Sequence, residues 1–452
     1  MMKLQLTGHV TQEQTLTYLN LPFEVPPQTG RIEVSYHYTD PVSSDPLITH
    51  GSTVDIGIFD PRGAEFIAQG YRGWSGSARL HFFVAEQEAT PGYLHGPIQA
   101  GTWHICLGLY KIPPQGCTYT VDITLLPTEH APREDFPTLL TLSDVPNPDT
   151  IRHDDGWYQG EIHCHTVHSD GDSTAQEVIY KAELMNLDFL AIMDHNNITH
   201  LSEIATLNTR LMLIPGYEVT TYHGHWNIWG NINWIDFRVT DAEMLRQAMQ
   251  TAAERGYLVS CNHPKPYGPD WDYKEVTEYA CVEVWNGPWL GMNQTALEFW
   301  DAQLQAGRKL VAVGGSDAHF HHREHSAQLA EPTNWVYCAD APTPTSILQA
   351  MRAGHVCVSR EPNRTRIEIC VGDVMMGDTC KLRGQLLEIH LTQPVTGELR
   401  VYTQTGCVMK FDTTETTADF LHPIPEGTRY IRVELRDPED AMISLTNPIY
   451  FT

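Results

Sequence analysis

The strongest constraint on the fold is a repeated succession of apolar run, loop and amphipathic helix between residues 156 and 362. Two capping-box sequences, from Thr174 to Glu177 and from Thr240 to Glu243, predict the starts of two of these helices. Strands that alternate with helices in this way form a parallel sheet or barrel. Apolar runs typical of its strands occupy 189–193, 211–214, 257–260, 282–285 and 310–313.

The segments on either side of this region lack the helical pattern. Short alternating runs at 31–38, 54–59, 78–84 and 103–110 predict an N-terminal β-sandwich over residues 1–135. Residues 136–155 are rich in Pro, Asp and Thr and are typical of a linker. Alternation returns at 386–391, 398–402 and 430–435, which predicts a small all-β domain over 363–452. The fold class is therefore α/β, with a helix-containing domain over 156–362 and all-β domains on either side.

Composition and charge limit the classes of molecule that the protein is expected to bind. The chain has 452 residues, more than one core normally holds, and its net charge of −27 repels nucleic acid polymers and anionic lipid. The N-terminus turns polar too early for a secretory signal, and no run is long enough to span a membrane. The ten cysteines show no CxxC spacing, which suits reduced thiols. We expect a cytoplasmic protein with a small-molecule substrate, and the sequence leaves its oligomeric state open.

Histidine and carboxylate residues gather just beyond the strand-like runs. Thirteen of the 23 histidines fall between His153 and His325. In α/β barrels, the loops after the carboxyl ends of the strands build the active site. The polar clusters are His163-Cys164-His165, Ser169-Asp170-Gly171, Asp194-His195-Asn196, Gly216-Tyr217-Glu218, His223-Gly224-His225, Asn262-His263-Pro264 and Ser316-Asp317-Ala318-His319.

The chemistry of these clusters suits metal ions. Because side chains alternate along a strand, His163 and His165 point to the same face and can bind one ion. The Cys164 side chain points to the opposite face, into the packed interior. Imidazole together with carboxylate suits Zn, Mn or Fe, and one carboxylate can bridge two ions. His168, His321, His322 and His325 flank the clusters, and we interpret them as solvated or supporting residues. Asp194 is interpreted in the same way, as a residue that orients its neighbour.

With the motifs HxH, SDG, DHN, GxE, NHP and SDxH in this order, the chain resembles the PHP (polymerase and histidinol phosphatase) metallohydrolases over roughly 200 residues. The runs from Arg72 to Ser77 and from Pro91 to Tyr93 are similar to the CehA/McbA-type branch, which includes carbamate-hydrolysing enzymes. The resemblance implies a distorted (β/α)7 barrel that holds two or three divalent ions.

The resemblance also assigns ligands. It implies that His163, His165, Glu218 and Asp317 bind one ion and that Asp170, His195 and His319 bind a second. Glu218 would bridge to a third ion with His263 and one histidine of the pair His223 and His225. We choose His225, because the Gly224-His225 pair is more similar to the branch.

The function expected from this site is metal-dependent hydrolysis of a small, anionic phosphodiester or monoester by a hydroxide shared between ions, with Glu218 and Asp317 at the catalytic centre. Lys265 and Arg323 follow ligand motifs, and Arg72 and Trp74 lie on the sandwich, so these four are candidates to contact the substrate. Two alternatives remain open. One is carbamate or carboxylic ester hydrolysis at the same site, and the other is a non-catalytic metal-binding module.

Overall fold

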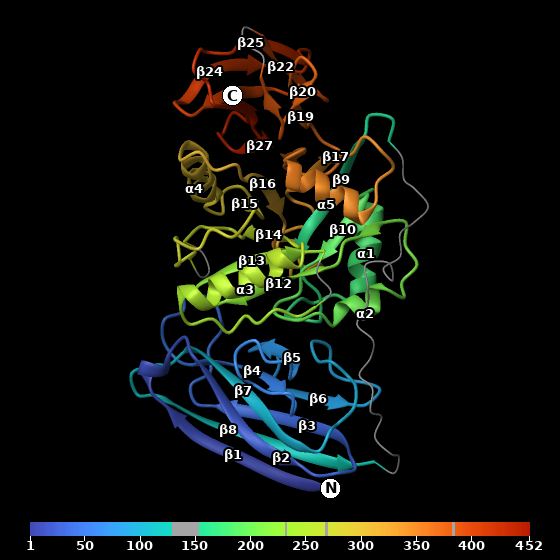
Figure 1. The fold of residues 1–452 in the computed structure, drawn as a ribbon, viewed down its shortest axis with the longest axis vertical. Coiled ribbons are helices and arrows are strands. Elements are labelled where there is room, and N and C mark those ends of the chain that lie inside the picture. The colour runs from blue at the N-terminus through green and yellow to red at the C-terminus, as the bar shows by residue number, and fades with distance from the viewer. Residues whose placement is uncertain (129–152, 231–232, 267–269, 382–384) are drawn as a thin grey trace.

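The computed structural model describes residues 1–128, 153–230, 233–266, 270–381 and 385–452 (Figure 1). It is a mixed α/β fold, rich in strands and with five α-helices in these residues. Most of the predicted linker, residues 136–152, lies outside the described residues. Within the described residues, no helix combines the length and the apolar character that a membrane span needs.

The N-terminal part consists of two four-stranded antiparallel sheets with the orders β1-β8-β3-β6 and β2-β7-β4-β5. Alternate residues such as Ile32, Val34 and Tyr36 point inward, and both sheets contribute to one buried apolar cluster. A short 3-10 helix, η1 (Gln12–Gln14), follows the first strand. The strands are β1 (Met2–Val10), β2 (Tyr18–Val25), β3 (Thr29–Tyr38), β4 (Thr53–Phe59), β5 (Tyr71–Gly76), β6 (His81–Ala85), β7 (Gly101–Lys111) and β8 (Cys117–Pro127).

Two sheets form the middle part of the molecule. One begins β11-β10-β9-β17-β18, and the other has the order β12-β13-β14-β15-β16. The strands are β9 (Trp157–Cys164), β10 (Phe189–Ile192), β11 (Met212–Leu213), β12 (Gly216–Thr221), β13 (Gly224–Trp229), β14 (Leu258–Cys261), β15 (Cys281–Asn286), β16 (Val311–Gly315), β17 (Thr333–Tyr337) and β18 (Val356–Ser359).

The described sheets do not show the distorted (β/α)7 barrel that the resemblance implies, and they do not close into a barrel. The parallel pairs are β9 with β10, β10 with β11, β14 with β15 and β15 with β16, but β12, β13 and β14 run antiparallel. The reason is local, because only Tyr222 and His223 separate β12 from β13, and so short a turn joins antiparallel strands without a helix. Two isolated bridges, His195 with Glu218 and Cys164 with Ala318, join the two sheets, and the Asn334 side chain of β17 hydrogen-bonds the backbone of Gly314 in β16. These bridges bring the ends of both sheets together.

The helices are α1 (Ala175–Leu184), α2 (His200–Ile204), α3 (Ala242–Glu254), α4 (Asn293–Gln305) and α5 (Pro344–Ala353). Thr174 caps α1 as predicted, with its hydroxyl accepting from Glu177 N and the Glu177 side chain returning to Thr174 N. Helix α3 begins one residue later than predicted. Its cap is Asp241, whose carboxylate accepts from Met244 N at 2.9 Å.

The C-terminal part, at the red end of Figure 1, is all β and has its own apolar cluster. It is joined to the middle sheet where β27 pairs with β18, and Asn447 hydrogen-bonds both backbone groups of Ala312. Its strands are β19 (Ile367–Val371), β20 (Val374–Met375), β21 (Thr379–Cys380), β22 (Leu386–Leu391), β23 (Gly397–Thr403), β24 (Gly406–Thr413), β25 (Asp419–Pro423), β26 (Tyr430–Arg436), β27 (Met442–Thr446) and β28 (Ile449–Phe451).

The N-terminal sheets are fastened to the middle part by hydrogen bonds and stacked rings. The Tyr71 hydroxyl donates to Asn196 O at 2.7 Å, and its ring stacks on Trp234 with centroids 4.2 Å apart. Arg238 of the middle part donates to Ala64 O and Glu65 O of the sandwich. The sheet β2-β7-β4-β5 therefore lies against the loops that carry the histidine clusters (Figure 1).

Candidate metal centre

The predicted ligands come from strand ends that the chain separates by up to 156 positions, and the fold gathers all of them in one place. His163 lies in β9 and Glu218 in β12, whereas His263 and Asp317 follow β14 and β16. Three groups have ligand atoms within 4.8 Å of one another: His163 with His165 and Glu218; Glu218 with His225 and His263; and His165 with Asp170, His195 and His319.

Glu218 is shared by two of these groups. Its Oε1 atom lies 3.4 Å from His163 Nε2, 3.3 Å from His225 Nδ1 and 3.4 Å from His263 Nε2. Its Oε2 atom lies 2.7 Å from His195 Nδ1 and 3.9 Å from His165 Nε2. Each oxygen thus faces a different set of imidazoles, as a bridging carboxylate does.

The third group is built from the loops after β9, β10 and β16. The Nε2 atoms of His195 and His319 lie 3.2 Å apart, and Asp170 Oδ1 lies 3.5 Å and 3.3 Å from them. Asp317, outside the three groups as defined, has its Oδ1 atom 2.9 Å from His165 Nε2 and 3.5 Å from His163 Nε2. It stands at the junction between the first and third groups.

Several buried imidazole nitrogens in the cluster have no hydrogen-bond partner among the described residues. They are His163 Nε2, His165 Nδ1 and His263 Nε2. An orphaned buried nitrogen loses the free energy of its hydration, so native structures usually give it a partner. A divalent cation would be such a partner for the Nε2 atoms of His163 and His263, which both face Glu218. The donor set therefore fits divalent metal ions.

Protonation within the cluster also suits a cation. Burial lowers the pKa of His163, but the charge of Glu283 and of two further carboxylates raises it well above its usual range. Burial raises the pKa of Glu218, yet His163 and its other imidazole neighbours hold it well below its usual range. Burial and the nearby His319 lower the pKa of His165 to about 3. The carboxylates thus favour positive charge at His163, where a metal ion would take the place of the proton, whereas ionised Glu218 and neutral His165 already have the forms that bind metal.

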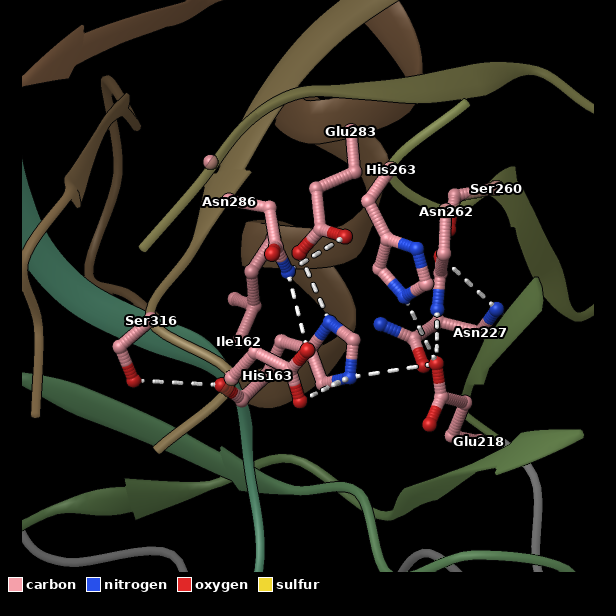
Figure 2. A network of polar contacts seen from close by, with 12 residues as sticks. Ile162, His163, Glu218, Asn227, Ser260, Asn262, His263, Glu283, Asn286 and Ser316 are labelled. Carbon is pink, nitrogen blue, oxygen red and sulfur yellow. Dashed lines mark hydrogen bonds and ion pairs between the residues drawn. The ribbon is translucent and has the colours of Figure 1, made fainter. Parts of the chain in front are cut away.

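Two residues that the sequence analysis did not single out hold ligands in position (Figure 2). Glu283 Oε1 lies 2.7 Å from His163 Nδ1. The Asn286 amide donates to Asp317 Oδ2 at 3.2 Å and to Glu283 Oε2 at 3.3 Å. A carboxylate on the second nitrogen of a ligand histidine sets its tautomer and orientation. Both residues belong to β15: Glu283 is a charged residue inside the apolar run at 282–285 and Asn286 directly follows that run, which are the signals that could have found them.

Further supports surround the cluster. Asn262 donates to Glu218 Oε1 at 2.9 Å, and Ser260 in turn hydrogen-bonds Asn262 (Figure 2). Asp194 accepts from the backbone and hydroxyl of Thr166 and from the hydroxyl of Ser169, so it braces the loop that carries Asp170. This placement agrees with its interpretation as a supporting residue.

Glu161 is a second buried carboxylate that the sequence analysis missed. Its Oε1 atom accepts from His163 N at 2.8 Å and Ser316 N at 3.2 Å, and its Oε2 atom accepts from Ala330 N at 2.7 Å. Burial raises its pKa to about 7. One side chain thereby ties β9 to the loop that carries Asp317.

The backbone is left-handed at two predicted ligands. His263 has φ 29° and Asp317 has φ 53°, values that side-chain-bearing residues rarely adopt. Such conformations are destabilising and persist where the surroundings enforce them, often at functional sites. Each residue lies two positions after a strand that ends at the cluster, β14 for His263 and β16 for Asp317.

Two residues predicted to contact the substrate, Lys265 and Arg323, lie away from the cavity described below. Lys265 is buried, and its Nζ atom donates to Asn286 O and Asn293 Oδ1. The Arg323 guanidinium is exposed and lies 3.8 Å from the centre of the Phe320 ring. His223 pairs with Asp272 at 3.0 Å and stands outside the three groups, whereas His225 belongs to one.

Arg72 does not reach the site, contrary to its selection as a substrate contact. Its side chain is only 1% exposed and donates to the carbonyls of Leu94, Gly96 and Pro97, with Asp60 at 3.5 Å. The register of β5 against β4 shifts between Tyr71 and Gly73, so Arg72 does not share a face with Trp74 and turns into the sandwich, where backbone carbonyls surround the guanidinium. Trp74, two residues later, does line the cavity.

A cavity of about 470 Å³ opens between the ligand cluster and the sheet β2-β7-β4-β5. Asp170, His195 and His225 of the cluster line it on one side. Tyr18, Asp55, Trp74 and Tyr110 line it from the sandwich. A molecule in this cavity would touch both parts of the chain.

Comparison with known proteins gives short or distant similarities. No family model matches the chain. A stretch of 63 residues is 33% identical to a 5'-3' exoribonuclease of Haemophilus influenzae; it covers 14% of this chain and 23% of that protein, so the chain matches about a quarter of its relative.

Two solved structures show a distant likeness to the chain. One is a two-domain protein of Bacteroides vulgatus described as containing a predicted PHP-like metal-dependent phosphoesterase, with 15% identity over 67% of this chain and 99% of that one and a TM-score of 0.39. Another is an amidohydrolase of Chromobacterium violaceum, with 17% identity over 44% of this chain and 96% of that one and a TM-score of 0.30.

Proposed function

We propose that the protein is a metal-dependent hydrolase of small esters, with phosphodiesters or phosphomonoesters as the leading substrates. The observation that carries the proposal is the position of Glu218, whose two oxygens face separate sets of imidazoles within one cluster. A carboxylate shared in this way, with histidine on both sides, is typical of sites for two or more divalent ions such as Zn, Mn or Fe.

Bound ions would supply an activated water and positive charge against the ester oxygens. The residues of the chain would orient the metal ligands and hold the substrate. Glu283 fixes the ring of His163, and Asn262 fixes the carboxylate of Glu218, so the ligands are already oriented before substrate enters. The cavity beside Asp170, His195 and His225 would hold the ester against the cluster. Glu218 and Asp317 are the central carboxylates of this arrangement.

The cavity favours small substrates over polymers. Its volume of about 470 Å³ suits a small molecule, and the net charge of −27 opposes the approach of nucleic acid. The short similarity to an exoribonuclease is in keeping with phosphodiester chemistry. We retain a small ester as the expected partner, and a cytoplasmic location is in keeping with ten free cysteines.

A second candidate is hydrolysis of a carbamate or carboxylic ester. The observation that favours it is the lining of the cavity, which among the described residues includes no Lys or Arg to meet additional phosphate charge. The same ions and ligands serve both reactions, because each begins with attack of water on a polarised oxygen-bearing centre.

One experiment tests the proposal and separates the candidates. Metal content is measured on the purified full chain, and three substrates with the same leaving group are then compared: 4-nitrophenyl phosphate, bis(4-nitrophenyl) phosphate and 4-nitrophenyl N-methylcarbamate. We expect bound metal and turnover of at least one of them. Asp317→Ala and His163→Ala should lose both, whereas His322→Ala, at an exposed position, should keep both. Full activity in protein verified to be metal-free would contradict the proposal.

A further inference from the structure

The wall of the cavity opposite the metal ligands is made of aromatic rings from both parts of the chain. Tyr222 stacks between two tyrosines, with centroids 5.2 Å from Tyr18 and 5.3 Å from Tyr110. Trp74 packs against Phe237 with centroids 4.7 Å apart. All five line the cavity. Rings held against one another in this way offer flat apolar surfaces to a flat ligand group.

The lining holds little positive charge. Among its described residues the only cations available are the histidines of the cluster. Two basic residues lie close by, but Arg79 donates to the carbonyls of Val167 and Ser169, and Lys111 donates to those of Ser43 and Asp45. An anionic group at the aromatic end would therefore lack a charged partner, which is unfavourable in a partly buried site.

Asp55 introduces a negative charge at that end. It lies in β4, is mostly buried, and lines the cavity. The Tyr222 hydroxyl donates to its Oδ2 atom at 2.7 Å, and Ser77 also hydrogen-bonds the carboxylate. A carboxylate has about four acceptor positions, so two donors leave it able to accept another. No lysine or arginine in the described parts of the chain forms an ion pair with it.

Tyr18 supplies an independent sign of a missing ligand. Its hydroxyl is buried, lies on a residue that lines the cavity, and has no hydrogen-bond partner among the described residues. Buried hydroxyls are nearly always paired. A ligand with polar atoms at its edge would satisfy this hydroxyl and Asp55 together.

We propose that this aromatic end of the cavity binds the leaving group of the ester, and that this group is an uncharged ring whose N–H or O–H donates to Asp55. The proposal rests on the hydrolase function above and adds the class of leaving group. The N-terminal sandwich then selects the substrate, since Asp55, Tyr18 and Trp74 all belong to it.

Binding of leaving-group analogues to the full metal-loaded chain tests this without any turnover. The probes are resorcinol, which has two O–H donors, 1,3-dimethoxybenzene, which has none, and 3-hydroxybenzenesulfonate, which adds a negative charge. Isothermal titration calorimetry gives each Kd. We expect resorcinol to bind about tenfold more tightly than 1,3-dimethoxybenzene, because a hydrogen bond to a carboxylate is a strong one. The sulfonate should bind more weakly than resorcinol.

The preference should depend on Asp55. Asp55→Asn keeps the shape of the side chain and should reduce the preference at least threefold, and Asp55→Ala should abolish it. Asp122→Ala changes a carboxylate on β8, in the other sheet of the sandwich, and should leave it unchanged. Equal binding of the two neutral probes to the wild type, tighter binding of the sulfonate, or an unchanged preference in both Asp55 variants would each overturn the proposal. Because no step is hydrolytic, a protein that binds these rings but cleaves no ester would contradict the proposed function alone.

Discussion

Glu283 Oε1 lies 2.7 Å from Nδ1 of His163, while the other nitrogen of the same ring lies 3.4 Å from Oε1 of Glu218. The Glu283 carboxylate thus holds Nδ1 of the His163 ring, and Nε2 of the same ring faces the cluster (Figure 2). Carboxylates in this position orient a ligand histidine and make it more basic. Glu283 is therefore a positioning residue for His163.

Glu283→Gln is expected to weaken metal binding about 10- to 100-fold while leaving the fold intact. The amide keeps the size of the side chain but loses the charge that holds the His163 ring. Competition with a chromogenic chelator measures the affinity. Glu298→Gln, an exposed change on α4, is the matched control and should have no effect. Equal affinities for the wild type and Glu283→Gln would remove Glu283 from the site.

Alanine substitutions of His223 and His225 show which of the two histidines is the metal ligand, a choice between two residues of one motif in the sequence. His225 Nδ1 faces Glu218, whereas His223 pairs with Asp272. We expect His225→Ala to lower the metal content by about one ion per chain. His223→Ala should retain it. Elemental analysis after gel filtration gives the count, and metal loss in His223→Ala alone would reverse the assignment.

Removal of metal is expected to lower thermal stability together with activity. Without cations, Glu218, Asp170 and Asp317 lose the charges that balance them. An ion present at 100 times its Kd stabilises the fold by about 3 kcal/mol, which disappears on chelation. Scanning calorimetry before and after treatment with dipicolinate measures the change in Tm. Restoration of both properties by added metal is the control, and an unchanged Tm with full activity would argue against a metal centre.

Arg72→Ala is expected to destabilise the sandwich rather than to change substrate preference. The guanidinium is buried beside Asp60 and donates to three carbonyls, and removing one member of a buried charged network destabilises a protein by about 3 kcal/mol or more. Arg31→Ala breaks a partly exposed pair with Glu33 and should change stability by less than about 1 kcal/mol. Urea denaturation measures both. A stable Arg72→Ala protein with altered kinetics would restore Arg72 as a substrate contact.

Asp55 should make stability depend on pH. Burial raises its pKa to about 6 in the folded protein, above the value of about 4 for an unfolded chain. The folded state therefore favours the protonated form, and ionisation of Asp55 makes folding less favourable as pH rises from 4 to beyond 6. Asp55→Asn removes this dependence. The variant should be more stable than the wild type at pH 7, by at most about 3 kcal/mol, and equally stable at pH 4.

Calorimetric Tm values of the two proteins at pH 4, 5, 6 and 7 test this prediction. Only the difference between the proteins is compared, because other groups titrate over the same range. A difference that does not change with pH would mean that the carboxyl has an ordinary pKa in the fold.

The sequence predicted those features of the site that depend on residues close to one another along the chain. Alternation along a strand placed His163 and His165 on one face, and the succession of strand and loop put His195, His263 and Asp317 at strand ends. The cap of α1 was likewise readable, because Thr174 and Glu177 lie within one turn. The cap of α3 was misplaced by one residue, since Thr240 and Asp241 are both able to cap.

Only the tertiary structure decided which distant residues meet. Glu283 reaches His163 across 120 positions of sequence, and Asp55 reaches Tyr222 across 167. Local patterns extend over one element and carry no information on which strands become neighbours. The same limit explains Arg72, whose chemistry suits an anion but whose side chain the packing of the sandwich turns inward. Strand-end position and a family resemblance thus proposed the ligands of the candidate metal centre, whereas packing decided their supports and the walls of the cavity, because both depend on contacts between distant parts of the chain.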